Sequence, residues 1–202
     1  MAKKCTPSNQ MPAIIVPHGK SEKLLAQHIR ACLRLPIYIH PKKTSIQING
    51  LFHELQTNYP NIQSLKCNEN LSLNIEKNKI ISDFKIFTLM DTDDCTEEKK
   101  KSYIDKSLFD KYELKQLIVP IYTSPKLELV LYKSGIIPKV FNDSEKVAGY
   151  KEIFDIPKLP YGKTKDEELR ELSEKLRKNK DTNLEDFIDY CIEQSTIRKV
   201  QF

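Results

Sequence analysis

The sequence has no long apolar run and no closely spaced pair of cysteines. Its longest apolar runs span only a few residues, so we expect no signal peptide and no membrane-spanning segment in the 202 residues. The five cysteines are odd in number and widely separated, which argues against a disulfide framework and against a zinc ribbon. Reduced thiols of this kind favour a cytoplasmic protein, and the short apolar runs predict no association with a membrane.

A strong excess of one charge is also missing. Lys and Arg total 33 against 28 Asp and Glu, a net charge of +5, and the lysine-rich stretches lack interleaved aromatic residues. Such a mildly basic surface permits nucleic-acid binding without implying it. The sequence has no internal repeat or low-complexity segment, and its length suits one domain with a single core.

Short apolar runs alternate with helix-like segments through the first two thirds of the chain. The runs predict strands at 13–16, 37–39, 84–90 and 117–122. Apolar residues at helical spacing predict helices at 21–34, 50–59 and 125–134, the last with Ser124 as N-cap and Pro125 at its first position. Strands separated by helices indicate a parallel α/β sheet, in which active sites lie beyond the carboxyl ends of the strands.

The character of the sequence changes near residue 139, after which no strong strand follows. A short helix is predicted at 143–153, and amphipathic helices are predicted at 164–179 and 184–195, the first of them opened by a capping box at Thr164 and Glu167. We therefore predict an α/β domain at 13–138 and a helical C-terminal extension at 139–202 that packs on the same core.

One predicted strand ends in a cluster of acids. The stretch FKIFTLMDTDDCT, residues 84–96, places Asp91, Asp93 and Asp94 directly after a buried run. Asp91 and Asp93 could converge on one ion at a strand end, and carboxylate oxygens suit Mg²⁺ or Mn²⁺. The same pattern also fits a solvated turn, or a helix cap provided by Asp94.

A second candidate, HGKSE at residues 18–22, follows the first strand. Gly19 could supply a positive φ or a close backbone approach, and the helix start beyond it offers free amides to a phosphate. A P-loop is excluded because its further glycines and Lys-Ser/Thr pair are absent. A plain strand-turn-helix junction is the alternative. Glu128, after the 117–122 strand, could likewise be a simple exposed helix acid.

Taken in order, these motifs resemble the Toprim domain of topoisomerases, bacterial primases and OLD-family nucleases. More specifically, the chain is similar to the RloB-type Toprim-like proteins of bacterial defence loci. The similarity rests on IIVPHGKSE (14–22), FTLMDTDD (87–94), TSPKLELVLYKSG (123–135) and LPYGKT (159–164). It implies a Toprim-like, Rossmann-like parallel sheet flanked by helices, with a C-terminal helical extension.

The resemblance also implies roles for individual residues. The metal ligands would be Asp91, Asp93, His18 and Glu128, and the catalytic groups His18, Glu22, Lys20, Glu128 and Lys163. Lys20 and Lys163 would contact phosphate. His18 stands where the family has a glutamate. An imidazole can bind a metal or move a proton, but it removes one negative charge from the site.

The function that this resemblance implies is Mg²⁺- or Mn²⁺-dependent hydrolysis of phosphodiester bonds in DNA or RNA, in anti-phage defence. The implied partners are nucleic acid and a protein from the same locus. The histidine at position 18 and the lack of an ATPase domain favour a different hypothesis. In that alternative, the chain is a catalytically compromised module that binds a nucleotide, a nucleic acid or a protein partner within a defence complex.

Overall fold

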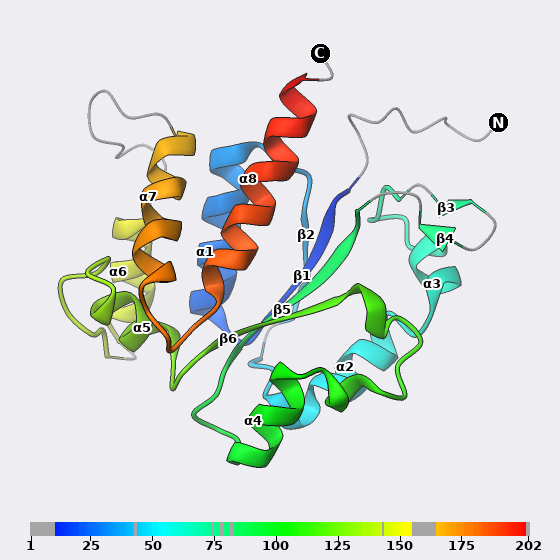
Figure 1. The fold of residues 1–202 in the computed structure, drawn as a ribbon, viewed down its shortest axis with the longest axis horizontal. Helices are drawn as coiled ribbons and strands as arrows, with labels where there is room; N and C mark the ends of the chain where they lie inside the picture. The colour runs from blue at the N-terminus through cyan, green and yellow to red at the C-terminus, as the bar shows by residue number, and fades with distance from the viewer. Residues whose placement is uncertain are drawn as a thin grey trace.

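A four-stranded parallel sheet runs through the centre of the protein (Figure 1). The computed structural model describes residues 11–42, 44–73, 75–76, 79–80, 83–142, 144–154 and 165–200. The sheet has the order β2-β1-β5-β6, with β1 at Ala13–Pro17, β2 at Tyr38–Ile39, β5 at Lys85–Asp91 and β6 at Ile118–Thr123. A separate antiparallel pair joins β3 (Ile75–Glu76) to β4 (Lys79–Ile80). The predicted parallel α/β sheet is confirmed.

Helices cover both faces of the sheet (Figure 1). One face carries α1 (Lys20–Leu33), α5 (Leu127–Lys133), α6 (Lys146–Ile153), α7 (Lys165–Arg177) and α8 (Leu184–Val200). The other carries α2 (Ile48–Asn58), α3 (Ile62–Cys67), α4 (Glu97–Ile104) and the short 3-10 turns η2 (Ser107–Phe109) and η3 (Lys115–Leu117). The predicted C-terminal helical region is confirmed, while the domain division at residue 138 stays a prediction. Within the described ranges, no helix has the length and apolar character that a membrane crossing needs.

The period-two alternation of β5 decides which way its terminal acid points. Successive side chains of a strand face opposite sides of the sheet. Phe87 and Leu89 belong to the core shared with α1 and α8, whereas Ile86 and Met90 belong to the core on the α2 side. Asp91 continues the Phe87 and Leu89 series, so its side chain faces the start of α1.

Tyr103 on α4 anchors that helix to the back of the sheet. Its fully buried hydroxyl donates to the Thr88 carbonyl oxygen at 2.6 Å and lies 3.0 Å from the Ile121 carbonyl oxygen. Thr88 belongs to β5 and Ile121 to β6, so a single side chain ties two strands to α4.

We expect Tyr103→Phe to lower the free energy of unfolding by about 1–3 kcal/mol, because buried acceptors would lose their donor. Urea unfolding measures this difference, with Tyr132→Phe as the matched control because Tyr132 is about half exposed. A loss of equal size in the control would contradict the anchoring role.

The predicted start of α5 is wrong by two residues. The helix begins at Leu127 with Lys126 as N-cap, and Ser124 and Pro125 form a turn with a cis peptide bond. The reason is tertiary: Thr92 N donates to the carbonyl oxygen of Pro125 at 2.9 Å, so that oxygen is engaged outside the helix. The predicted capping box at Thr164 lies outside the described residues.

The connection between α7 and α8 lies against the outer edge of β6. Thr182 forms an antiparallel bridge with Thr123, and its hydroxyl donates to the Tyr122 carbonyl oxygen at 2.7 Å. Asn183 Oδ1 accepts from Tyr122 N at 2.9 Å, and Asn183 Nδ2 donates to the Pro120 carbonyl oxygen at 3.0 Å. This connection is therefore fixed relative to the carboxyl end of the sheet.

Candidate active site

A cavity of about 490 Å³ opens at the carboxyl ends of β1 and β5, between the starts of α1 and α5 and one side of α6. Its lining residues are His18, Gly19, Lys20, Ser21, Glu22, Leu24, Asp91, Asp93, Lys126, Glu128, Lys146 and Tyr150. It brings together six of the predicted site residues, namely His18, Lys20, Glu22, Asp91, Asp93 and Glu128. Lys163 lies outside the described residues.

Asp91 is the most firmly held acid of the cavity. Its Oδ1 accepts from the Thr123 hydroxyl at 2.5 Å and from Leu127 N at 2.9 Å. Only 9% of the residue is exposed. Burial raises the pKa of its carboxyl to about 6, although these two hydrogen bonds lower the pKa in part. The end of β6 and the start of α5 thus fix one oxygen of Asp91.

Glu22 sits one turn into α1 and folds back toward Gly19. Its Oε2 accepts from Gly19 N at 2.7 Å. Burial, followed by the charge of Asp91, raises the pKa of the Glu22 carboxyl to about 8. Gly19 has an extended backbone, not a positive φ, and an added Cβ would lie 3.3 Å from Glu22 Oε2. Of the two roles predicted for Gly19, the structure shows the close approach.

Glu128 faces the cavity, and the interpretation of it as an exposed helix acid is wrong. The residue is 2% exposed, and its Oε1 accepts from the Ser21 hydroxyl at 3.0 Å. Lys146 Nζ lies 3.4 Å from the same oxygen. Glu128 therefore links α5 to α1 and α6 at the cavity wall.

His18 and Asp93 line the cavity, whereas Asp94 is not one of its lining residues. His18 Nδ1 is buried without a hydrogen-bond partner among the described residues. Asp93 also lines the cavity but is exposed, whereas Asp91 is buried. Asp94 is half-buried; burial raises its pKa, and the nearby His18 imidazole counteracts that shift. Helix α4 is capped by Thr96 and not by Asp94, as the Lys99 N–Thr96 Oγ1 contact of 3.4 Å shows.

Three polar residues that line the cavity were not among the predicted site residues. Lys126 occupies the N-cap position of α5, and Lys146 and Tyr150 come from α6 in the C-terminal region. Tyr150 is fully buried, and its hydroxyl makes no hydrogen bond of standard geometry to a described residue. The i, i+4 spacing of Lys146 and Tyr150 does place them on one helix face, but nothing in the sequence ties that face to the strand ends.

The donor chemistry of the cavity suits a hard divalent cation. Glu22, Asp91 and Glu128 are buried together, and the contacts described above engage one oxygen of each. Among the described residues, however, no group of three or more His, Cys, Asp or Glu side chains is already spaced as a ligand set. The residue types therefore fit Mg²⁺ or Mn²⁺, while ion binding would have to draw the carboxylates together.

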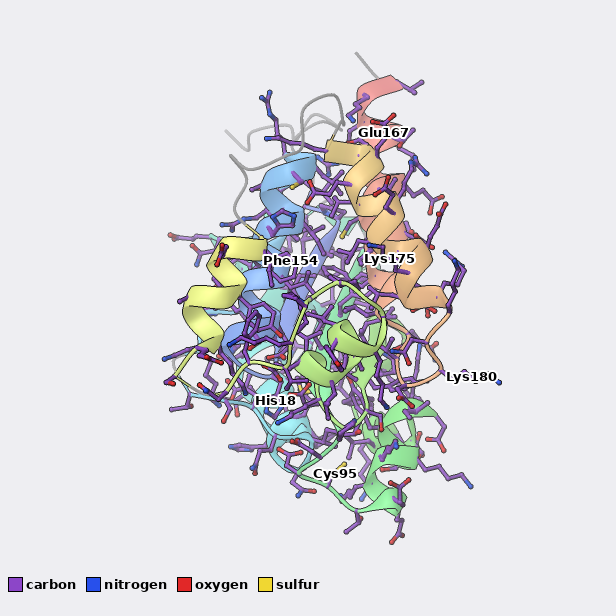
Figure 2. All side chains as sticks on the ribbon, turned by 90° about the vertical axis from the view of Figure 1, so that its left-hand side faces the viewer. His18, Cys95, Phe154, Glu167, Lys175 and Lys180 are labelled. Carbon is purple, nitrogen blue, oxygen red and sulfur yellow. The ribbon has the colours of Figure 1, made fainter. Side chains whose placement is uncertain are left out.

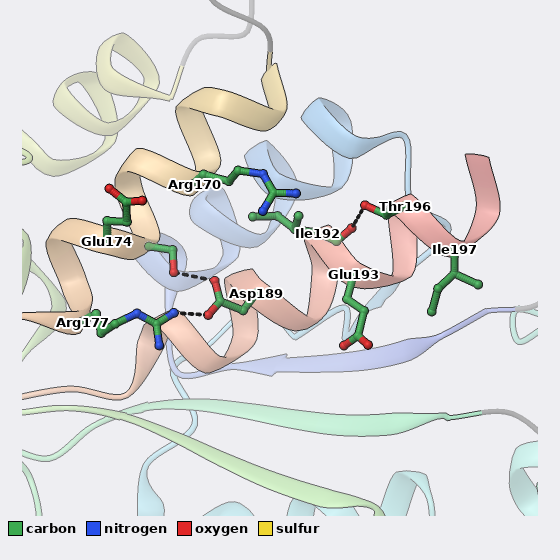
Figure 3. A pocket seen from close by; sticks show the side chains of 9 residues that line it. Arg170, Glu174, Arg177, Asp189, Ile192, Glu193, Thr196 and Ile197 are labelled. Carbon is green, nitrogen blue, oxygen red and sulfur yellow. Dashed lines mark hydrogen bonds and ion pairs between the residues drawn. The ribbon is translucent and has the colours of Figure 1, made fainter. Parts of the chain in front are cut away.

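A second hollow of about 520 Å³ lies between α7 and α8 (Figure 3). Asp189 occupies its wall, accepting from the Ser173 hydroxyl at 2.6 Å and pairing with Arg177. The Thr196 hydroxyl donates to the Ile192 carbonyl oxygen of its own helix at 2.9 Å. These contacts are those of a helix pair, and the hollow contains no residue that the sequence motifs indicate.

Comparison of the chain with protein-family models, with curated proteins and with solved structures gave no match. What the cavity can do is therefore inferred from its own residues.

Proposed function

We propose that this cavity hydrolyses phosphodiester bonds of nucleic acid with the help of a bound Mg²⁺ or Mn²⁺ ion. The observation that supports the proposal is the joint burial of Glu22, Asp91 and Glu128 at the carboxyl edge of a parallel sheet. Burying several carboxylates in one cavity is costly unless a bound cation or a retained proton offsets their repulsion. The Toprim resemblance implies the same residues and the same chemistry, in anti-phage defence.

Asp91, Glu128 and Asp93 would hold the ion, with His18 as a further candidate ligand. When bound, the ion would polarise the scissile phosphate and lower the pKa of an attacking water. Lys20 at the cavity mouth would neutralise charge on the phosphate oxygens.

The proton transfers would use the two groups nearest the start of α1. His18, which lines the cavity, would take the proton of the attacking water through its imidazole as the new P–O bond forms. Burial raises the pKa of Glu22 to about 8 in the metal-free protein, and this carboxyl would give a proton to the leaving oxygen as the old P–O bond breaks. One acid and one base thus flank the same cavity.

The direct test is incubation of the protein with labelled single-stranded DNA, single-stranded RNA and duplex DNA. We expect strand cleavage with Mn²⁺ or Mg²⁺ and none with EDTA, because the carboxylates alone cannot activate water. Gel separation of the products measures it. Cleavage that persists in EDTA, or no cleavage of any substrate in either metal, would contradict the proposal.

The second candidate function is a binding module without catalysis, in which the cavity holds a nucleotide, a nucleic acid or a protein partner. Two observations favour it: Glu22 is engaged by Gly19 N, and the described acids are not spaced as a ligand set. A thermal-shift titration with Mg²⁺ and Mn²⁺ separates the two candidates. A melting temperature that neither Mg²⁺ nor Mn²⁺ changes, together with no cleavage, would favour the binding module.

A further inference from the structure

A basic hollow of about 490 Å³ lies beside the candidate active site, at the other end of α5. Its lining residues are Lys133, Ser134, Lys175, Lys178, Asn179, Lys180 and Asp181. Lys133 Nζ pairs with Asp181 at 2.6 Å, so their charges cancel. Lys175, Lys178 and Lys180 are exposed and pair with no acid in the described part of the chain. The hollow therefore carries a local excess of about three positive charges.

Helix-dipole stabilisation explains only part of this cluster. Lys133 lies in the last turn of α5 and Lys175 in the last turn of α7, where a cation stabilises the helix end. Lys178 and Lys180 lie beyond Arg177, the last residue of α7, and Figure 2 shows the Lys180 side chain pointing away from the body of the protein. These two lysines need another explanation.

The loop that carries them is held rigidly. Asn179 Nδ2 donates to the Val130 carbonyl oxygen at 3.3 Å and to Ser134 Oγ at 3.0 Å, which ties the loop to α5. The carbonyl oxygen of Asp181 accepts from Ser124 N at 2.8 Å, next to the Thr123 that holds Asp91. The two lysines are thus presented at a fixed position relative to the catalytic carboxylates.

Helix α5 connects the two sites. Glu128 at its start faces the cavity, and Lys133 at its end lines the basic hollow. Lys133 lies five positions after Glu128, which corresponds to about 7.5 Å along the helix axis, close to the axial rise of about two nucleotides of one strand. A strand that follows α5 would place one phosphate at the carboxylates and a phosphate about two nucleotides away at the end of α5, where the hollow lined by Lys178 and Lys180 begins.

We propose that the hollow around Lys178 and Lys180 binds the phosphodiester backbone of the nucleic-acid strand next to the position of cleavage. This inference rests on the proposed function for the identity of the ligand. The lysines contribute affinity and direct the strand across α5 without touching the reacting phosphate.

The test uses Lys178→Gln/Lys180→Gln in full-length protein carrying Asp91→Asn, so that binding is measured without cleavage. Fluorescence anisotropy with single-stranded DNA, single-stranded RNA and duplex DNA should show affinity reduced about tenfold at low salt. The slope of log K against log salt should fall by about 1.4 for a single strand, since each phosphate contact contributes about 0.7. The matched control, Lys66→Gln/Lys111→Gln, removes two exposed lysines on the α2 side and should leave both values unchanged.

Lys178→Arg/Lys180→Arg keeps the charge and should restore binding. Equal losses in the Gln variant and the control, or no binding by any form, would overturn the inference. Cleavage by protein with an intact Asp91 is measured in parallel. Binding that depends on the two lysines, without cleavage, would support the inference and refute hydrolysis. Cleavage together with binding that does not depend on the lysines would support hydrolysis and overturn the inference.

Discussion

Replacing Asp91 with asparagine should reduce metal-dependent cleavage at least about a hundredfold while leaving the protein folded. The amide keeps the shape of the side chain, and its oxygen can still accept from Thr123 and from Leu127 N. What is lost is the negative charge that would hold a divalent cation. The rate of oligonucleotide cleavage at saturating Mn²⁺ measures the effect.

The same substitution should leave the free energy of unfolding at about pH 8 unchanged or raise it. Burial raises the pKa of Asp91 to about 6, which means that the folded state disfavours its charge. Removing that charge therefore removes the free-energy cost of burying it. Asp110→Asn is the control, because Asp110 is an exposed acid paired with Lys115 away from the cavity. If Asp91→Asn retained full activity, Asp91 could not be a metal ligand.

The metal-free protein should lose stability as the pH rises from about 5.5 to about 8.5. The pKa of Glu22 is raised from 4.5 to about 8 and that of Asp91 from 3.8 to about 6, in both cases chiefly by burial. At a pH between the ordinary and the raised pKa of each carboxyl, the folded protein keeps a proton on that carboxyl, whereas the unfolded chain has released it. This contribution to stability is complete below the ordinary pKa values and is lost as the pH rises through the raised ones.

Thermal unfolding in EDTA measures the effect, and we expect the midpoint to fall by about 5 °C or more across this range. Glu22→Gln/Asp91→Asn should flatten the dependence, because neither side chain can then titrate. Mn²⁺ should stabilise the unsubstituted protein more at about pH 8 than at about pH 5.5, since protons and metal compete for the same oxygens. A midpoint that rises with pH in EDTA would contradict the buried-acid interpretation.

The site residues that could be predicted are those that follow directly from the pattern of apolar and charged residues in the sequence. A buried run that ends in Asp91 is visible in the sequence, and parallel strands bring their ends to one edge, so the meeting of His18 with Asp91 follows from topology. The orientation of Glu128 could not be predicted, because its neighbours Leu127 and Leu129 are both apolar. Its direction is set by the Ser21 hydroxyl of another helix.

The cavity residues on α6 could not be predicted from the sequence for a related reason. Lys146 and Tyr150 reach the cavity because α6 packs against α1, and that packing depends on contacts between segments far apart in the chain. The start of α5 was misplaced for the same reason, since the Thr92 contact that holds Pro125 outside the helix comes from the end of β5. Local rules indicated the candidate residues, and tertiary contacts determine what surrounds them.

The connection between α7 and α8 also covers one edge of the sheet. An edge strand with free backbone groups is a template for strand addition from another chain. Along β6, Asn183 and Thr182 occupy the backbone groups of Pro120 and Tyr122, and Pro120 itself has no amide hydrogen to offer. A strand from another protein could extend the sheet at β6 only by first displacing that connection, so strand addition at this edge is disfavoured.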